Sequence, residues 1–254
     1  MISDSLAFRI LSIFGCWLTN ESSEIKSRKV LYWIYSLFVF ANLYLLNLLC
    51  VIHMIIEFQN DVESVIETFI TYAALLFVCC KIKVLIFNRN DFIKLDNSLS
   101  DNLLAAKAEN EIQIHNYCNK KLKYIIIVCT ILAEMCGMLF CAIPLISKEK
   151  RESRELPLKI WLPFKVDDSN FRVLFIWQVV LFVYGCAIHC CSDCIFVEFI
   201  EHGCAKLTIL ASRLESVSKI IKSGKKANMK KEDISKFEKQ ILRPLFIQHQ
   251  LIYK

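Results

Sequence analysis

The sequence predicts an all-α membrane protein, a helical transmembrane bundle that crosses the bilayer four times. Hydrophobic residue types make up 56% of the 254 residues, and the mean hydropathy is +0.44. The apolar residues occur in long uncharged blocks, whereas a soluble core produces short stripes at helical or strand spacing. Only five glycines and four prolines are present, which does not fit a β-rich or disordered composition.

The first predicted span covers residues 30–56, which contain no Asp, Glu, Lys or Arg over 27 residues. A membrane-crossing helix needs about 20 apolar residues. Tyr32, Trp33 and Tyr35 stand at the start of the span, where an aromatic belt is expected at the membrane interface. Residues 1–29 precede it, and we expect them to hold an interfacial helix.

The other three predicted spans contain a few charged residues. Lys81 and Lys83 can extend their ammonium groups toward the lipid headgroups. Glu134 and Asp193 are intramembrane carboxylates, which usually face the interior of a bundle. We expect Asp193 to be paired structurally, whereas Glu134 could contact either a ligand or a neighbouring helix. The predicted spans are residues 64–87, 122–146 and 171–200, and the polar segments between and after them are residues 88–121, 147–170 and 201–254.

The distribution of Lys and Arg predicts the orientation of the chain. With four crossings, 21 of these residues fall on the side of the N-terminus and six on the other side. The positive-inside rule therefore places the N-terminus, residues 88–121 and residues 201–254 in the cytoplasm, and residues 147–170 outside the cell. Phe237 is the single aromatic residue among the lysines of residues 219–239, so the repeated aromatic side chains that stack on bases are missing. We therefore expect these lysines to form a solvated cytoplasmic face, with contact to anionic membrane lipids as the alternative, and we expect no contact with nucleic acid.

No arrangement of residues in the sequence predicts catalysis or a cofactor. No two glycines lie within ten residues of each other, which excludes a glycine-rich phosphate loop and a dinucleotide-binding fingerprint. Most of the thirteen cysteines lie in apolar runs, where a thiol behaves as a small hydrophobic side chain. The cysteine-rich stretch 189–194 has no second cluster of ligands that could complete a zinc site. We predict that the protein is not an enzyme and uses no cofactor or metal.

Several motifs occur in an order that is typical of one receptor family. The motif LPLKIWLPF at residues 156–164 precedes the fourth span, Gln178 and Asp193 follow within that span, and residues 244–253 close the chain. These stretches resemble insect odorant receptors, the seven-helix ligand-gated cation channels of insect olfactory neurons. The motif resembles the extracellular loop of that family, which ends in a Trp-x-Pro-Phe element. Residues 244–253 resemble the helix that leads to its fifth span.

The resemblance implies a fuller architecture and a function. The four spans would be the first four of seven, in an N-terminal portion that lacks the pore-lining last helix. The chain would be an odorant receptor subunit in the plasma membrane of olfactory neuron dendrites, where it binds small volatile molecules. It would gate a cation conductance in a heterotetramer with a co-receptor, assembled through cytoplasmic helices such as residues 203–222 and 231–250.

The resemblance also implies where an odorant binds, in the extracellular half of the bundle. Depth within the second, third and fourth spans selects the candidate ligand-binding residues Phe69, Tyr72, Glu134, Gly137, Met138, Cys141, Val180 and Tyr184. Two alternatives remain open: a four-span structural or accessory membrane protein, and a gustatory-type receptor.

Overall fold

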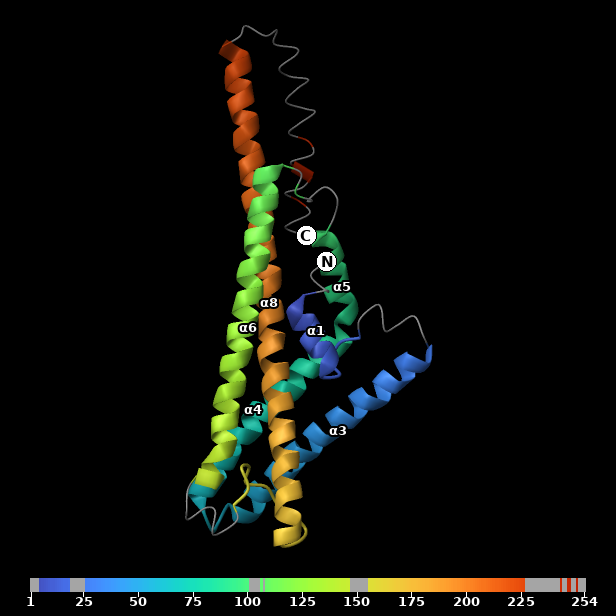
Figure 1. Ribbon diagram of the computed structural model, residues 1–254, viewed down its shortest axis with the longest axis vertical. Helices are drawn as coiled ribbons and strands as arrows, with labels where there is room; N and C mark the ends of the chain where they lie inside the picture. The colour runs from blue at the N-terminus through green and yellow to red at the C-terminus, as the bar shows by residue number, and fades with distance from the viewer. Residues whose placement is uncertain are drawn as a thin grey trace. The chain divides into compact units, whose positions relative to one another are not determined.

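The computed structural model describes residues 5–18, 26–100, 106, 108–146, 155–226, 243, 246–247 and 250. In this part of the chain all regular structure is helical, which confirms the all-α prediction (Figure 1). The predicted helix over residues 231–250 lies almost entirely outside the described residues. The helices are α1 (Leu6–Ile13), α3 (Lys26–Glu57), α4 (Val62–Phe87), α5 (Arg89–Leu99), α6 (Glu109–Ile146) and α8 (Asp168–Lys226).

Four helices of the described chain are long and apolar enough to cross a membrane, which confirms the four-span prediction. These candidate spans are Ser27–Glu57, Val62–Phe87, Glu109–Ile146 and Asn170–Lys219. Two of the helices extend well past the predicted spans, because α6 already begins at Glu109 and α8 continues to Lys226. Hydropathy identifies the part of a helix that suits lipid, and it does not locate the polar ends where the same helix continues into water.

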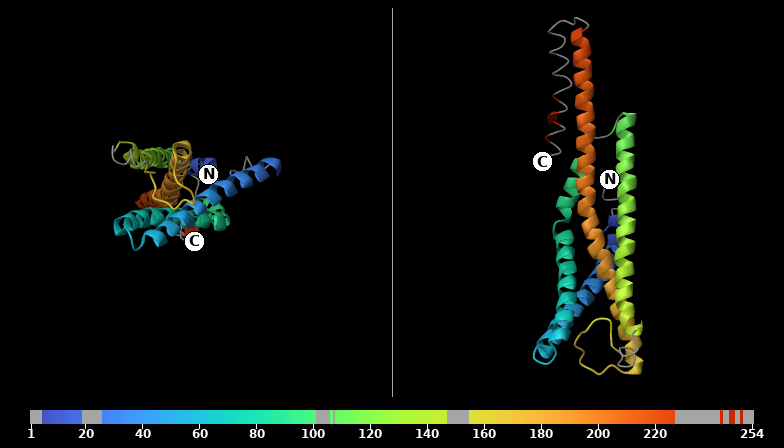
Figure 2. Two further views of the ribbon diagram at one scale, coloured as in Figure 1. Left: turned by 90° about the horizontal axis from the view of Figure 1, so that it is seen from below. Right: turned by 90° about the vertical axis from the view of Figure 1, so that its left-hand side faces the viewer.

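The described residues form two compact units, and α6 and α8 contribute to both. Within the described residues, we call residues up to 89 together with residues 125–195 the α3–α4 unit, and residues 90–124 together with those from 196 onward the α5 unit. In the α3–α4 unit, α3 and α4 are joined by a short connection and pack against each other as a hairpin (Figures 1 and 2).

The N-terminal segment folds back onto the start of α3. The hydroxyl of Tyr32 donates to the Trp17 carbonyl at 2.9 Å, and the hydroxyl of Tyr35 donates to the Ile13 carbonyl at 2.8 Å. The hydroxyl of Ser36 donates to the carbonyl of Gly15, which has φ of +80°. The position of these tyrosines in an aromatic belt at the membrane interface stays a prediction. In the structure they fasten the N-terminal segment to α3.

The same segment also contacts the start of α5. The Arg89 guanidinium lies 5.3 Å from the centre of the Trp17 ring and donates a hydrogen bond of 2.9 Å to the Leu18 carbonyl. The Trp17 ring packs in turn on Phe8 of α1 at 4.5 Å between ring centres. Burial raises the pKa of the nearby Cys16 thiol to about 12, so this thiol stays protonated and unreactive at neutral pH. All thirteen cysteines lie in the described residues, and none forms a disulfide.

Two charged residues within the spans of the α3–α4 unit, Lys81 and Asp193, pair with each other. The Lys81 ammonium lies 2.7 Å from Asp193 Oδ1 and 2.9 Å from His189 Nδ1. The expected structural pairing of Asp193 is therefore confirmed. Lys81 bonds across to α8, where a carboxylate on the facing helix satisfies its charge directly.

The α5 unit is held together by aromatic and ionic contacts between α5, the start of α6 and the far part of α8. Phe92 of α5 packs against Phe199 of α8 at 6.0 Å between ring centres. The Lys121 ammonium lies 2.7 Å from the Glu201 carboxylate. Arg213 binds Glu111 through two hydrogen bonds of 2.7 Å each.

Candidate ligand-binding site

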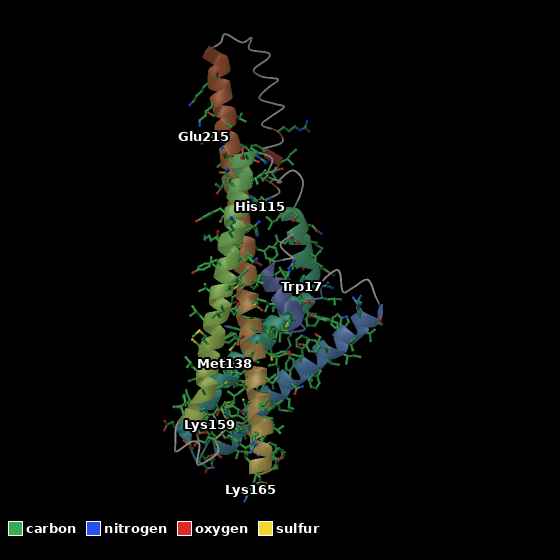
Figure 3. The ribbon with its side chains drawn as sticks, in the orientation of Figure 1. Trp17, His115, Met138, Lys159, Lys165 and Glu215 are labelled. Atoms are coloured by element: carbon green, nitrogen blue, oxygen red, sulfur yellow. The ribbon has the colours of Figure 1, made fainter. Side chains whose placement is uncertain are left out.

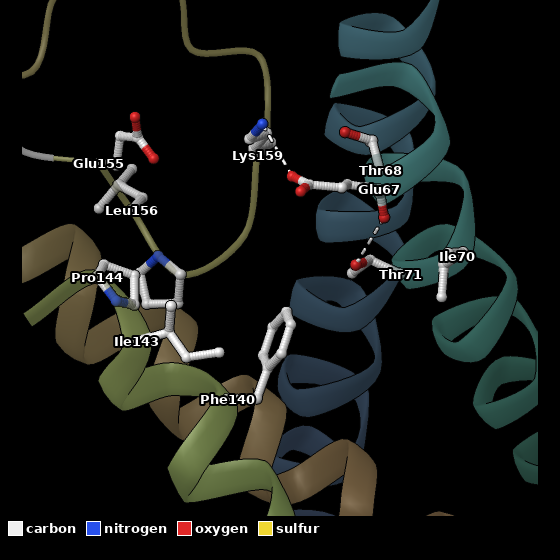
Figure 4. Close-up of a pocket in the computed structure, with 11 residues that line it drawn as sticks. Glu67, Thr68, Ile70, Thr71, Phe140, Ile143, Pro144, Glu155, Leu156 and Lys159 are labelled. Carbon is white, nitrogen blue, oxygen red and sulfur yellow. Dashed lines mark hydrogen bonds and ion pairs between the residues drawn. The ribbon is translucent and has the colours of Figure 1, made fainter. Parts of the chain in front are cut away.

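A pocket of about 230 Å³ lies in the α3–α4 unit, at the end where α4 begins and α6 ends (Figure 4). Residues 155–159 close it on the third side, and they include the first residues of the LPLKIWLPF motif. The described lining comprises Glu67, Thr68, Ile70 and Thr71 of α4, Phe140, Ile143 and Pro144 of α6, and Glu155, Leu156, Pro157 and Lys159.

The two helix ends that form the pocket are shaped by local sequence. The Asp61 carboxylate caps α4 by accepting a hydrogen bond of 3.1 Å from the Ser64 amide, which satisfies one of the free donors of the first turn. Pro144 lies in the last turn of α6. Because proline has no amide hydrogen, the Phe140 carbonyl receives no helical hydrogen bond from that position.

An ion pair spans the rim of the pocket. The Lys159 ammonium lies 2.8 Å from the Glu67 carboxylate, and Figure 4 shows these side chains pointing toward each other from two different elements. The hydrogen bond to Glu67 raises the pKa of Lys159, so its ammonium stays charged at neutral pH. Ile143, Pro144 and Leu156 supply an apolar surface beside this pair. An apolar wall with a few polar groups is the usual composition of a small-molecule site.

The wall formed by residues 155–159 is fixed by a buried glutamine. The side-chain oxygen of Gln178 accepts from the Leu158 amide at 2.9 Å, and its side-chain nitrogen donates to the Leu158 carbonyl at 3.1 Å. Both residues are buried, with 0% of Gln178 and 1% of Leu158 exposed. The Trp161 amide donates a further hydrogen bond of 3.3 Å to the Leu49 carbonyl of α3. The backbone of the motif is therefore hydrogen-bonded to the Gln178 side chain of α8 and to the Leu49 carbonyl of α3.

The described lining of the pocket contains none of the eight residues predicted to bind ligand. Phe69, Met138 and Val180 are exposed on α4, α6 and α8, at 57%, 50% and 46%, and Figure 3 labels Met138 on α6. Tyr72 and Glu134 are half-buried. These five side chains lie outside the described lining of this pocket, and their role in ligand binding stays a prediction.

The other three predicted residues take part in packing between helices. Gly137 and Cys141 are buried, and Gly137 faces Phe182 of α8, since a Cβ built on the glycine would lie 2.9 Å from that ring. Tyr184 shares a hydrogen bond of 3.0 Å with the hydroxyl of Tyr35 and meets the Phe14 ring edge-on at 4.7 Å. Tyr184 thus connects α8 to the docked N-terminal segment.

Replacing Gly137 by alanine is expected to destabilise the protein by about 1–3 kcal/mol, because the added methyl group overpacks the contact between α6 and α8. Thermal unfolding of the purified protein in detergent measures the effect. Gly203→Ala is the matched control, since nothing lies within 4 Å of a Cβ at that position of α8. Equal unfolding temperatures for the two variants would show that Gly137 does not serve close helix packing.

The arrangement described so far is that of a multi-pass helical membrane protein with a small-molecule pocket at one end of its spans. The family model of the 7tm odorant receptors matches residues 61–254, and the chain belongs to this family. No curated protein matches the sequence.

Two solved structures show the same fold. They are the insect olfactory receptor OR5 from Machilis hrabei, with a TM-score of 0.66, and the same receptor in complex with eugenol, with a TM-score of 0.65. Each is 17% identical to this chain and is matched over 97% of it. This chain spans about two thirds of the length of OR5, 67% and 64% of the two structures.

Proposed function

We propose that this chain is an odorant receptor subunit that binds small volatile molecules and, together with a co-receptor, gates a cation conductance. The observation that carries the proposal is the pocket between α4, α6 and residues 155–159, found in a member of the odorant receptor family. Its volume of about 230 Å³ lies below the roughly 300–1,000 Å³ of pockets for drug-sized ligands, and therefore suits a smaller molecule.

Orientation in the membrane supports a role in sensing. With the N-terminus in the cytoplasm, as the distribution of Lys and Arg favours, the pocket opens on the extracellular side of the plasma membrane of an olfactory neuron. A ligand that binds there more tightly in the open than in the closed state shifts the gating equilibrium by that difference in affinity. The predicted residues deeper in the spans, including Tyr72, Met138 and Val180, would contact the same ligand or a second one.

Co-expression with the co-receptor in oocytes tests the proposal. The full-length product of the gene is challenged with a panel of volatiles that includes eugenol, the ligand named for the OR5 complex. We expect an inward cation current with at least one volatile, and none from either subunit alone. Surface biotinylation reports whether the subunit reaches the membrane. A surface-expressed subunit that adds no odorant-evoked current would favour a structural or accessory role instead.

A further inference from the structure

We propose that the pocket bounded by Glu67 and Lys159 binds small volatile amines, and that the ammonium group of the ligand takes the place of the Lys159 ammonium at the Glu67 carboxylate. This inference rests on the proposed function and adds to it the chemical class of the ligand. It depends on the charge of the rim, the exposure of the ion pair, and the apolar surface beside it.

The described part of the rim carries more negative than positive charge. Lys159 is the basic residue of the described lining, and Glu67 and Glu155 are its acidic residues. Asp61, the cap of α4, also acts electrostatically on the Lys159 ammonium, as do Glu67 and Glu155. Three carboxylates therefore surround one ammonium. A ligand with a positive charge lowers the electrostatic energy of this rim, whereas a carboxylic acid raises it.

The ion pair can be exchanged for a ligand because it is open to water. The side chain of Glu67 is 51% exposed, and that of Lys159 is 34% exposed. Ion pairs with this much exposure contribute little to stability, since each partner is well solvated when the pair opens. Lys159 stands on a loop and Glu67 on a helix, so the ammonium of Lys159 can swing away while the carboxylate stays in place.

The pocket also offers a surface for the hydrocarbon part of an amine. Ile143, Pro144, Leu156 and Pro157 form an apolar wall of the same pocket that the Glu67 carboxylate lines. An alkylammonium ion carries its charge at one end and an apolar chain at the other, which matches a carboxylate that borders an apolar wall. An alcohol of equal length fits the same wall but gains no charge–charge attraction.

Hexylamine and hexanol are the probes that separate charge recognition from shape recognition. Their affinities are measured from the shift in thermal unfolding of the purified full-length receptor in detergent, a readout that does not require gating. Glu67→Gln keeps the shape of the side chain and removes its charge. We expect it to weaken hexylamine binding about tenfold and to leave hexanol binding unchanged. Lys159→Met removes the competing ammonium and is expected to strengthen hexylamine binding severalfold.

Glu63→Gln is the matched control, because Glu63 lies in the first turn of the same helix and outside the described lining of the pocket. Equal losses of hexylamine and hexanol binding in Glu67→Gln would mean that the ion pair only clamps the loop, and would overturn the inference. A wild-type receptor that hexylamine does not stabilise would overturn it as well. Because binding is measured without the co-receptor, a failure of the current test would count against the proposed function and not against this inference.

Discussion

Replacing Gln178 by leucine is expected to lower the free energy of unfolding by about 2–6 kcal/mol, because the amide and carbonyl of Leu158 both lose their partner. Leucine is close to glutamine in size, so it creates no large cavity. It cannot accept or donate a hydrogen bond, however, and each unsatisfied buried polar group costs about 1–3 kcal/mol. Thermal unfolding in detergent measures the loss.

The same substitution should also weaken ligand binding in the pocket. Leu158 lies between two lining residues, Pro157 and Lys159, so a released loop removes one wall. We expect Gln178→Leu to weaken hexylamine and hexanol binding together, in contrast to the charge-specific effect of Glu67→Gln. Thr208→Val is the control on the same helix, since it deletes an exposed hydroxyl whose hydrogen bond runs to the Cys204 carbonyl one turn away. An unfolding temperature for Gln178→Leu as high as that of this control would contradict the role assigned to Gln178.

Much of the fold could be predicted because a helix that crosses a bilayer needs about 20 consecutive apolar residues. The long uncharged blocks predict the number and the approximate position of the spans. The charge of Asp193 within a span predicts that its carboxylate has a partner. What hydropathy does not report is which polar side chain bonds which backbone group. Hydropathy thus places Tyr32 and Tyr35 at the start of a span, but it does not reveal that their hydroxyl groups bind carbonyls of the N-terminal segment.

The candidate site was less predictable for the same reason. Depth within the spans selected Gly137 and Tyr184, and the structure shows that these residues serve contacts between helices. The predicted ligand-binding residues do not include Glu67 or Lys159, although Lys159 lies within the LPLKIWLPF motif that resembles an extracellular loop of the family. Their pairing depends on the loop folding back onto α4, and helical periodicity contains no information about that contact.

Replacing Glu111 by alanine is expected to destabilise the α5 unit by about 3 kcal/mol, because it leaves the Arg213 guanidinium without this partner in a largely buried position. The side chains of Glu111 and Arg213 are only 9% and 16% exposed. The pair is bidentate, with both bonds at 2.7 Å, a geometry in which charge-assisted hydrogen bonds are strong. It joins the first turn of α6 to the far part of α8, so hydrogen exchange along both helix segments should rise with the loss of thermal stability.

The effect depends on burial, and an exposed ion pair on the same helix provides the comparison. Glu215 pairs with Lys219 at 2.9 Å one helical turn away, and both side chains are largely solvent-exposed (Figure 3). Glu215→Ala removes the same charge as Glu111→Ala, yet it should leave the unfolding temperature unchanged within error. A reversed pair, Glu111→Arg with Arg213→Glu, should recover part of the lost stability, because the two charges meet again in the same enclosed site. Equal losses of thermal stability in Glu111→Ala and Glu215→Ala would show that burial does not strengthen the Glu111–Arg213 pair.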